Sequence, residues 1–544
     1  MPSVHQEVEV TLVADDSFEV PALRELLAET ALTELDAPAP VSEAAAVHQE
    51  LTATYYDTAD LRLAGAGLTL RRRTGGEDAG WHLKVPTAKG ARSEVRLPLG
   101  RATRTVPQAL RTTVRARTGG ADLVPVATTR TRRDVHRLLD ASGQVLAELA
   151  DDRVEAQRLL RTGGAAQGTG TPVAAWREIE VELVDGEHAV LDALVDGLRR
   201  HGLRRAEGPS KLAHVLELDA GGTGADDAEG SSGRDAAPAG RGGTQRQGRL
   251  TRKSPAGDVV LTHLREQVEQ VRAQDLPVRL DAPDAVHKMR VATRRLRSAL
   301  TTFKPLLDPE VARPLRAELK WLAAQLGAAR DAEVMRERVR AAVQAQADQL
   351  PHGVGADMDT ALEATYRSAH QQLLQELDGP RYLALLSGLE ALVERPPLTP
   401  GAARPAGKVL PRLVRRSWTA VGELVDRARA STVEAEREEL LHDARKAAKA
   451  ARYAGESVQV VFGADAADFA RAMEAVQEAL GEHQDSVLVR QRLQELALNS
   501  SSTAAAFAYG RLHALEEAGT ARSQHAFDAA WRAAGRKHLH RWTR

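Results

Sequence analysis

Residues 219–256 constrain the fold of this chain more than any other part of the sequence, because they form a low-complexity segment. Gly, Ala, Ser and charged residues dominate it, and large apolar side chains are almost absent. Such a segment buries too little apolar surface to offset the entropy lost on ordering, so we predict a flexible linker. The linker separates two parts, residues 1–218 and 257–544, each long enough to bury a core of its own.

The first part has the pattern of an antiparallel β-sheet. Apolar residues alternate with polar ones, or run together, between Gly, Asp and Pro breaks. Two further segments, 21–30 and 189–202, have the spacing of helices. We therefore predict seven or eight strands that can close into a barrel, with a few helices. The strand candidates are 7–13, 68–73, 81–85, 93–99, 126–139, 143–156 and 178–184.

The second part is predicted to be an all-α helical bundle with an internal duplication. Long Ala, Leu, Arg and Glu segments have a 3.6-residue period, and Pro and Gly fall between them. A histidine followed by cations at fixed offsets occurs twice, and a Leu-Gly-x-x-x-Asp motif follows each copy. We infer two repeat units, at about 257–400 and 408–544. The first copy is His287, Arg290, Arg294 and Arg297 with Asp331, and the second is His442, Arg445, Lys449 and Arg452 with Asp485.

Each repeat therefore has a stripe of cations along one helix face. At roughly 100° per residue, the offsets fall within an arc of about 80°. Like charges three and four residues apart repel each other, so a stripe destabilises its helix unless an anion lies on it. A solvated basic face is the simpler explanation. The recurrence of the pattern and the shortage of acidic residues on it favour an anion-binding site, with the two aspartates as partners of the arginines or as helix caps.

The charged residues of the predicted strands favour a polar barrel interior. Side chains two residues apart share a strand face, and here charges of one sign share each face. A solvated outer face, which is the simpler expectation for any single strand, usually mixes both signs. Because the sign differs between strands, a closed barrel can place cations opposite anions. The anionic candidates are Glu7, Glu9, Asp152, Glu178 and Glu180, and the cationic candidates are Arg71, Arg73, Lys84, Arg92, Arg130 and Arg132.

Such an interior suits phosphoryl transfer. Carboxylates select hard cations such as Mg²⁺ or Mn²⁺, and the absence of cysteine excludes thiolate metal sites and disulfides. Arg and Lys would bind phosphate oxygens while a metal-activated water attacks the terminal phosphorus. We therefore predict a divalent-metal-dependent phosphohydrolase in which the five carboxylates are metal ligands and the cations bind substrate. Glu7, Glu9 and Lys84 are its expected catalytic residues.

Both parts also resemble known families. The doubled stripes resemble the CHAD domain, a duplicated helical module, and this implies that the eight stripe residues bind inorganic polyphosphate. The first part resembles the CYTH, or triphosphate tunnel metalloenzyme, superfamily, which implies an eight-stranded antiparallel tunnel for a triphosphate substrate and a divalent metal. The expected fold class is thus α+β, a β-barrel followed by a helical bundle, as in bacterial CYTH–CHAD fusions. The CYTH resemblance is carried by EVEVT at 7–11, YYDT at 55–58, LRRR at 70–73, WHLKVP at 81–86, RSE at 92–94, EIEVEL at 178–183 and SK at 210–211. It implies that Lys211 also binds substrate, although on the residues alone Lys211 would be taken for a surface lysine.

One position departs from the CYTH pattern. The family opens with E-x-E-x-K, whereas this chain has Thr11 in place of the lysine. A hydroxyl donates a hydrogen bond but cannot neutralise charge. Either catalysis is weakened, or another cation such as Lys84 or Lys211 compensates. A second hypothesis therefore stays open: a non-catalytic polyphosphate-binding protein, targeted to polyphosphate granules.

Other classes of function are less favoured. No apolar run reaches ~18 residues and the start lacks a secretory pattern, so we expect a cytoplasmic protein without a membrane span. Adenylate cyclisation would need a pocket for the base, for which no motif is evident. Aromatic residues make up only 3% of the chain and the net charge is −1, which disfavours nucleic acid as a partner because stacking platforms are scarce.

Overall fold

The computed structural model divides into two compact units, Met1–Ala237 and Pro238–Arg544. It describes residues 3–29, 41–88, 91–100, 105–159, 174–206, 210–217, 249–500 and 502–544. Most of the linker expected at 219–256 lies outside these residues, and so do the side chains of 3–7, 29, 87–88, 91–92, 482–488 and 518–525.

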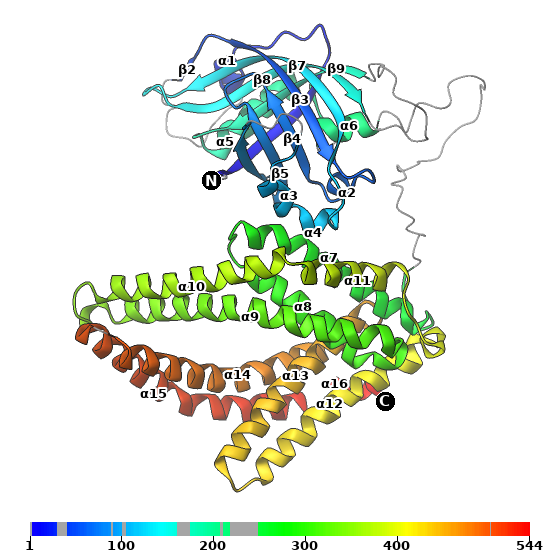
Figure 1. Ribbon diagram of the computed structural model, residues 1–544, viewed down its shortest axis with the longest axis vertical. Helices are drawn as coiled ribbons and strands as arrows, with labels where there is room; N and C mark the ends of the chain where they lie inside the picture. The colour runs from blue at the N-terminus through cyan, green and yellow to red at the C-terminus, as the bar shows by residue number, and fades with distance from the viewer. Residues whose placement is uncertain are drawn as a thin grey trace. The chain divides into compact units, whose positions relative to one another are not determined.

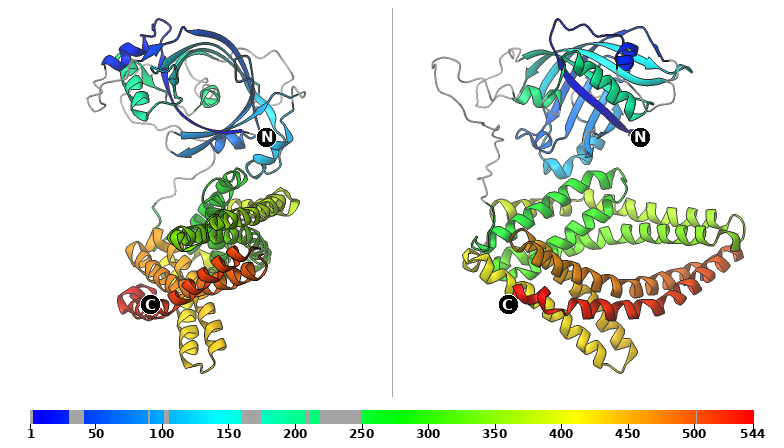
Figure 2. Two further views of the ribbon diagram at one scale, coloured as in Figure 1. Left: turned by 90° about the vertical axis from the view of Figure 1, so that its left-hand side faces the viewer. Right: turned by 180° about the vertical axis from the view of Figure 1, so that it is seen from behind.

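The first unit is an antiparallel sheet that curls into a barrel (Figure 2, left). Strand β1 pairs with β6 along its first half and with β9 along its second half, which joins the two edges of the sheet. The two pairings share only Val8, so β1 is a splayed seam. In order around the barrel the strands are β1 (Ser3–Ala14), β6 (Ala91–Pro98), β5 (Gly80–Ala88), β4 (Thr69–Thr74), β3 (Val47–Asp57), β7 (Val124–Leu139), β8 (Val145–Arg158) and β9 (Ala174–Leu183).

Helices outside and inside the barrel determine which strand face is polar. The helices α1 (Leu23–Glu29) and α5 (His188–Arg200) pack on the outer face, against side chains such as Leu149 and Ile179. Alternate residues of the same strands therefore point inwards. Helix α6 (Lys211–Glu217) lies inside the ring of strands, where its apolar side chains pack against β3 and β7 (Figure 2, left). The remaining short elements are β2 (Ser42–Glu43), α2 (Arg62–Gly65), α3 (Gln108–Thr113), α4 (Arg115–Thr118) and β10 (Arg204–Arg205).

The second unit is helical and internally duplicated (Figure 1). Its first set contains α7 (Ala256–Arg279), α8 (Ala285–Thr302), α9 (Pro309–Ala345), α10 (Val354–Asp378) and α11 (Pro380–Glu394). Its second set contains α12 (Ala406–Ala430), α13 (Glu434–Phe462), α14 (Ala464–Leu498), α15 (Thr503–Ala534) and the short α16 (Lys537–His540). The predicted fold class, a β-barrel followed by a duplicated helical bundle, is confirmed.

The starts of the two helical sets hold each other. Both α7 and α12 begin within a Pro-Ala-Gly sequence, directly after Pro255 and Pro405. The backbone N–H of Ala256 donates to the carbonyl oxygen of Arg404 at 2.9 Å, and the N–H of Ala406 donates to the carbonyl oxygen of Ser254 at 2.8 Å. These reciprocal bonds relate the repeats by an approximate two-fold. Among the described helices, none is both long and apolar enough to cross a bilayer.

Candidate functional site

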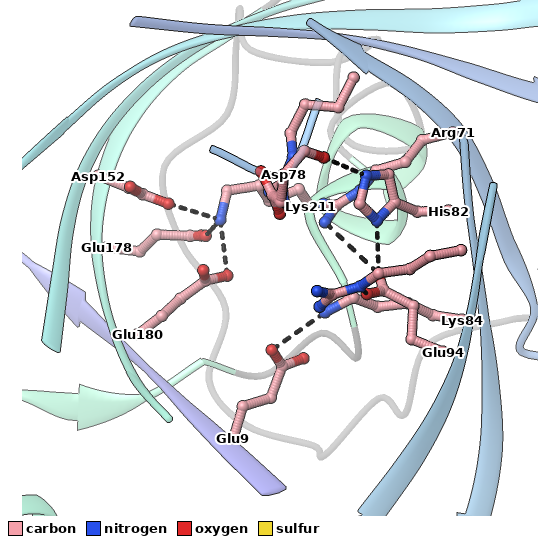
Figure 3. A network of polar contacts seen from close by, with 12 residues as sticks. Glu9, Arg71, Asp78, His82, Lys84, Glu94, Asp152, Glu178, Glu180 and Lys211 are labelled. Carbon is pink, nitrogen blue, oxygen red and sulfur yellow. Dashed lines mark hydrogen bonds and ion pairs between the residues drawn. The ribbon is translucent and has the colours of Figure 1, made fainter. Parts of the chain in front are cut away.

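Three carboxylates converge inside the barrel. Asp152 on β8 lies directly opposite Glu178 on β9, and Glu180 follows on the same face of β9. One oxygen of each carboxylate lies within 4.8 Å of the others, and the side chains of Asp152 and Glu178 are buried. We call this group the acidic cluster (Figure 3). Buried like charges this close repel each other strongly, so a cation must neutralise them.

Lys211 supplies one such cation. It is the first residue of α6, so the helix inside the barrel carries its ammonium to the acidic cluster. Its Nζ lies 2.9 Å from Asp152 and 2.7 Å from Glu180, and it also contacts Glu178 (Figure 3). Although burial favours the neutral amine, the three carboxylates raise the pKa of Lys211 well above its ordinary value. The ammonium therefore stands where a metal ion coordinated by these carboxylates would lie.

Arg133 is the second cation at the acidic cluster. Its Nε and Nη2 donate to Asp152 at 2.7 and 2.6 Å, and Nη2 also donates to Glu180 at 2.6 Å. Burial alone would raise the pKa of Glu180, but the charges of Lys211, Arg133 and Lys84 hold it well below its usual range. Burial dominates at Glu178 and raises the pKa of that carboxyl. The cluster thus has one firmly ionised member and one that takes up a proton more readily.

A cationic wall faces the acidic cluster across the barrel. Arg71 and Arg73 come from β4 and Lys84 from β5. Figure 3 shows Arg71 and Lys84 on the side opposite the acidic cluster. The Nζ of Lys84 lies 3.2 Å from Glu9, and Arg71 lies 3.9 Å from Glu94. The buried Nε atoms of Arg71 and Arg73 have no hydrogen-bond acceptor in the described part of the chain. Unpartnered buried donors are costly, so these two N–H groups favour an anion beside them.

A buried histidine positions this wall. His82 Nδ1 lies 3.0 Å from Glu94, and its Nε2 lies 2.9 Å from the backbone carbonyl of Asp78. Burial lowers the pKa of His82 to about 4. Glu94, which is fully buried, also accepts from Arg96, and Asp78 contacts Arg73. His82 therefore links the Glu94 carboxylate to the backbone of Asp78, whose own carboxylate contacts Arg73.

Two predicted substrate ligands lie on the wrong face. Arg130 and Arg132 are exposed, whereas their neighbour Arg133 reaches the acidic cluster. Because strand residues alternate between faces, Arg130 and Arg132 point outwards. The expectation that they line the interior is wrong. The motif R-T-R-R contains cations of both parities, and the direct pairing of Arg133 with Asp152 is the signal that identifies the inward one.

Most of the remaining predicted barrel residues lie in the acidic cluster or in the cationic wall. Asp152, Glu178, Glu180 and Lys211 meet in the acidic cluster, and Arg71, Arg73 and Lys84 meet in the cationic wall. Glu9 contacts Lys84 instead of joining the cluster. Glu7 and Arg92 are opposite each other in the register of β1 and β6, but their side chains lie outside the described part. The sequence interpretation did not assign roles to Arg133, His82, Glu94 and Asp78.

Thr11 stands directly opposite Glu180 in the register of β1 and β9. At this position β1 therefore brings no cation to Glu180. Lys211, Arg133 and Lys84 all act on Glu180. The positive charge that the threonine cannot supply is present beside Glu180, but it comes from other elements.

The two stripes of the helical unit come together. Helices α8 and α13 pack on each other. Burial, together with the charges of Arg290, Arg297 and Arg445, lowers the pKa of Arg294, so cations of both repeats surround this residue. Within the described residues, no carboxylate pairs with Arg294 or Arg297. His287 and Lys449 lie on the same helix faces, and the His442 Nδ1 is buried without a partner.

Glycine and carboxylate partners position the stripe arginines. Arg290 lies over Gly327 of α9 and pairs with Asp331 at 3.4 Å, and Arg445 lies over Gly481 of α14. A Cβ at Gly481 would come within 3.1 Å of Arg445, so this glycine leaves room for the guanidinium, whereas a Cβ at Gly327 would lie at an ordinary contact distance of 3.6 Å from Arg290.

The last stripe residue of the second repeat differs from its counterpart Arg297. Arg452 donates to Glu456 at 2.8 Å and pairs with Glu474 at 2.7 Å. The sequence pattern predicts that Arg452 binds an anionic ligand, but in the structure two carboxylates of the protein hold its guanidinium group.

Comparison with known proteins identifies the family. A CYTH domain model matches residues 24–215 and a CHAD domain model matches residues 262–494. An uncharacterized protein of Mycobacterium tuberculosis, found in two strains, is 35% identical over 496 residues, which cover 89% of this chain and 90% of the relative. The chain belongs to the CYTH–CHAD proteins. The predicted fusion of these two domains is confirmed.

Three solved structures show similarity to parts of this CYTH–CHAD protein. PptA from Streptomyces chartreusis is 24% identical with a TM-score of 0.43, and covers 51% of this chain and 100% of its own. The CHAD domain from the plant Ricinus communis is 27% identical with a TM-score of 0.42, and the match covers 52% of this chain and 94% of that domain's chain. A protein from Hippeastrum, described as having a dominant triphosphatase activity, is 17% identical with a TM-score of 0.22. The match covers 40% of this chain and 96% of the Hippeastrum chain.

The acidic cluster fits the divalent metal on which CYTH domains depend. All its donors are carboxylate oxygens, which hard divalent cations prefer. The cluster already surrounds the Lys211 ammonium, so its charge requires a cation at this point.

Proposed function

We propose that the barrel unit is a divalent-metal-dependent phosphohydrolase that acts on tripolyphosphate or a related triphosphate, and that the helical unit binds inorganic polyphosphate. The observation that carries the first proposal is the opposition of the acidic cluster and the cationic wall inside one barrel (Figure 3). Phosphoryl transfer needs both: cations for the charged oxygens and carboxylates for the metal.

Each group then has a role. Asp152, Glu178 and Glu180 would hold Mg²⁺ or Mn²⁺, which when bound supplies charge for the phosphate oxygens and an activated water. Arg71 and Arg73 would bind the phosphate chain through the N–H groups that have no acceptor in the described protein. Lys84, held by Glu9, would add a point charge.

Lys211 would change partners during binding. Its ammonium cannot share the centre of the acidic cluster with a metal ion of the same sign. With the ion in place, Lys211 would leave the carboxylates and reach the substrate phosphates instead. Arg133 would keep Asp152 and Glu180 in position throughout, because it donates to both carboxylates independently of Lys211.

The test is release of phosphate from tripolyphosphate by the full chain, with Mg²⁺ or Mn²⁺. We expect metal-dependent release, reduced about 100-fold in Glu180→Gln, since loss of a ligand weakens metal binding. The matched control is Glu155→Gln, because Glu155 is exposed on the outer face of β8. Its rate should equal that of the wild type.

A binding protein without turnover is the alternative that Thr11 favours. Absence of release above background, with polyphosphate binding retained, would support this alternative. In that case Thr11→Lys should restore activity only if the missing lysine is the sole defect.

The proposal for the helical unit rests on the cations around Arg294. Arg294→Gln should weaken retention of the full chain on immobilised polyphosphate, whereas Arg367→Gln should not, because Arg367 is exposed and pairs with Glu363. Equal retention of the two variants would contradict polyphosphate binding at the stripes. We also propose that the protein associates with polyphosphate granules, which Arg294→Gln should abolish in cells carrying a fluorescent fusion.

A further inference from the structure

A second concave surface of the helical unit carries three arginines on α12. The concavity has a volume of about 360 Å³ and is lined by Arg412, Arg415, Arg416, Thr419, Ala420 and Glu423. These positions share one face of α12, opposite the buried Leu410, Val414 and Val421. All three arginines are exposed, and within the described residues no carboxylate forms an ion pair with any of them.

The internal duplication shows that the fold does not require these arginines. Aligning the two Pro-Ala-Gly sequences places Thr262, Arg265 and Glu266 of α7 at the positions of Arg412, Arg415 and Arg416. These three positions thus carry one cation and one carboxylate in the first repeat, and three cations in the second.

The three arginines cost stability unless an anion neutralises them. They lie three and four residues apart, so their charges repel each other along the helix. Glu423 lies at the far end of the same face, about two turns beyond Arg416. Guanidinium groups on adjacent turns present N–H donors in the fork geometry that phosphate oxygens accept.

We propose that this concavity is a second anion-binding site, for a phosphate-type polyanion, separate from the stripes on α8 and α13. The site does not depend on the activity proposed for the barrel or on binding at the stripes. Inorganic phosphate chains fit it better than nucleic acid does, because the neighbouring Trp418 is already stacked. Its ring stacks on Trp531 at 5.0 Å and on His540 at 4.2 Å, so it is already engaged within the protein and is a poor platform for a base.

Footprinting of the arginines tests this site directly. The full chain is treated with phenylglyoxal, which modifies accessible arginines, with and without tripolyphosphate and in the absence of divalent metal. Peptide mass spectrometry then gives the modification rate at each position. We expect tripolyphosphate to protect Arg412, Arg415 and Arg416, and to leave the exposed, ion-paired Arg367 and Arg471 unprotected.

Two variants decide whether the site is real and separate. In Arg294→Gln, protection on α12 should persist, and its loss would show that the arginines of α12 belong to the stripe site. In the double variant Arg412→Gln with Arg416→Gln, the tripolyphosphate concentration that half-protects Arg415 should rise about tenfold, since two exposed charge contacts are lost. Arg367→Gln with Arg471→Gln removes the same net charge and should change nothing. Absence of protection on α12 in the wild type would overturn the proposal, whatever happens at the stripes.

Discussion

Residue parity on β7 decides which arginine reaches the interior of the barrel. Arg132 and Arg133 are adjacent, yet one is exposed on the outer face and the other donates to Asp152 and Glu180. The sequence shows that β7 carries several arginines, but not which of them face inwards, because R-T-R-R-D has a charged residue on both strand faces. The pairing partner across the strand resolves it.

Substitution of these two neighbours should have very different effects. We expect Arg133→Gln to lower the rate of phosphate release about 10- to 100-fold, because it removes charge-assisted hydrogen bonds to two carboxylates. Arg132→Gln should stay within about twofold of the wild type, since an exposed charge contributes little. Equal losses in the two variants would show that our assignment of the strand faces is incorrect.

Lys211→Met should strengthen metal binding. The ammonium contacts all three members of the acidic cluster, so a divalent cation must displace it. Without this competitor we expect the affinity for Mn²⁺, measured by calorimetry, to rise on the order of tenfold. Lys446→Met is the control, because Lys446 is an exposed lysine paired with Asp443. Unchanged or weaker Mn²⁺ binding in Lys211→Met would mean that the ammonium does not occupy the metal position.

Helices α8 and α13 are joined by a polar link between the repeats. Glu456 of α13 accepts from Arg295 of α8 at 2.8 Å and from Arg452 of its own helix at 2.8 Å. The repeat pattern in the sequence predicts the two stripes and their shared helix faces. It does not predict that Arg452 is held by carboxylates, because Glu474 comes from α14 and has no fixed spacing from the motif.

Removal of this link should destabilise the helical unit. Glu456→Gln leaves the Arg295 guanidinium without a charged partner and removes one of the two carboxylates that hold Arg452, so we expect a loss of about 1–3 kcal/mol in the free energy of unfolding. Urea unfolding followed by circular dichroism at the helical band measures it. Glu495→Gln, which breaks an exposed pair with Arg492, should cost close to nothing. If both variants unfold at the same urea concentration, the link has no structural role.

A buried histidine on α7 should make the stability of the helical unit depend on pH. Burial, with a contribution from Arg295, lowers the pKa of His263 to about 4 from its ordinary 6.5. The unfolded chain therefore binds a proton at this histidine more readily than the folded chain does. The contribution of His263 to the free energy of unfolding is complete above about pH 6.5 and falls by up to about 3 kcal/mol as the pH drops towards 4. His263→Gln should flatten this dependence and His352→Gln, at an exposed position, should not. The same pH profile in His263→Gln as in the wild type would refute the assignment.

Much of the whole molecule follows from sequence periodicity. The change from a period of two to a period of 3.6 on either side of residues 219–256 predicts a β unit and an α unit, and the recurring stripe predicts the duplication. The acidic cluster was predictable because Glu178 and Glu180 share parity. The position of Lys211 at its centre was not, because it depends on α6 entering the barrel, which no local pattern encodes.

Both units of this CYTH–CHAD protein gather cations, around the barrel interior and on the helical stripes, and in the barrel the buried Nε atoms of Arg71 and Arg73 have no acceptor among the described residues. If both bind phosphate chains, the linker would hold the enzyme near its substrate and raise the effective concentration. The phosphohydrolase activity proposed for the barrel depends most on the position of the metal ion inside it.

Anomalous diffraction from crystals of the full chain soaked with Mn²⁺ and tripolyphosphate locates that position directly. We predict a manganese peak between Asp152, Glu178 and Glu180, with the Lys211 ammonium turned away and the phosphate chain against Arg71 and Arg73. A barrel without manganese at these carboxylates, and with Lys211 still among them, would contradict the account.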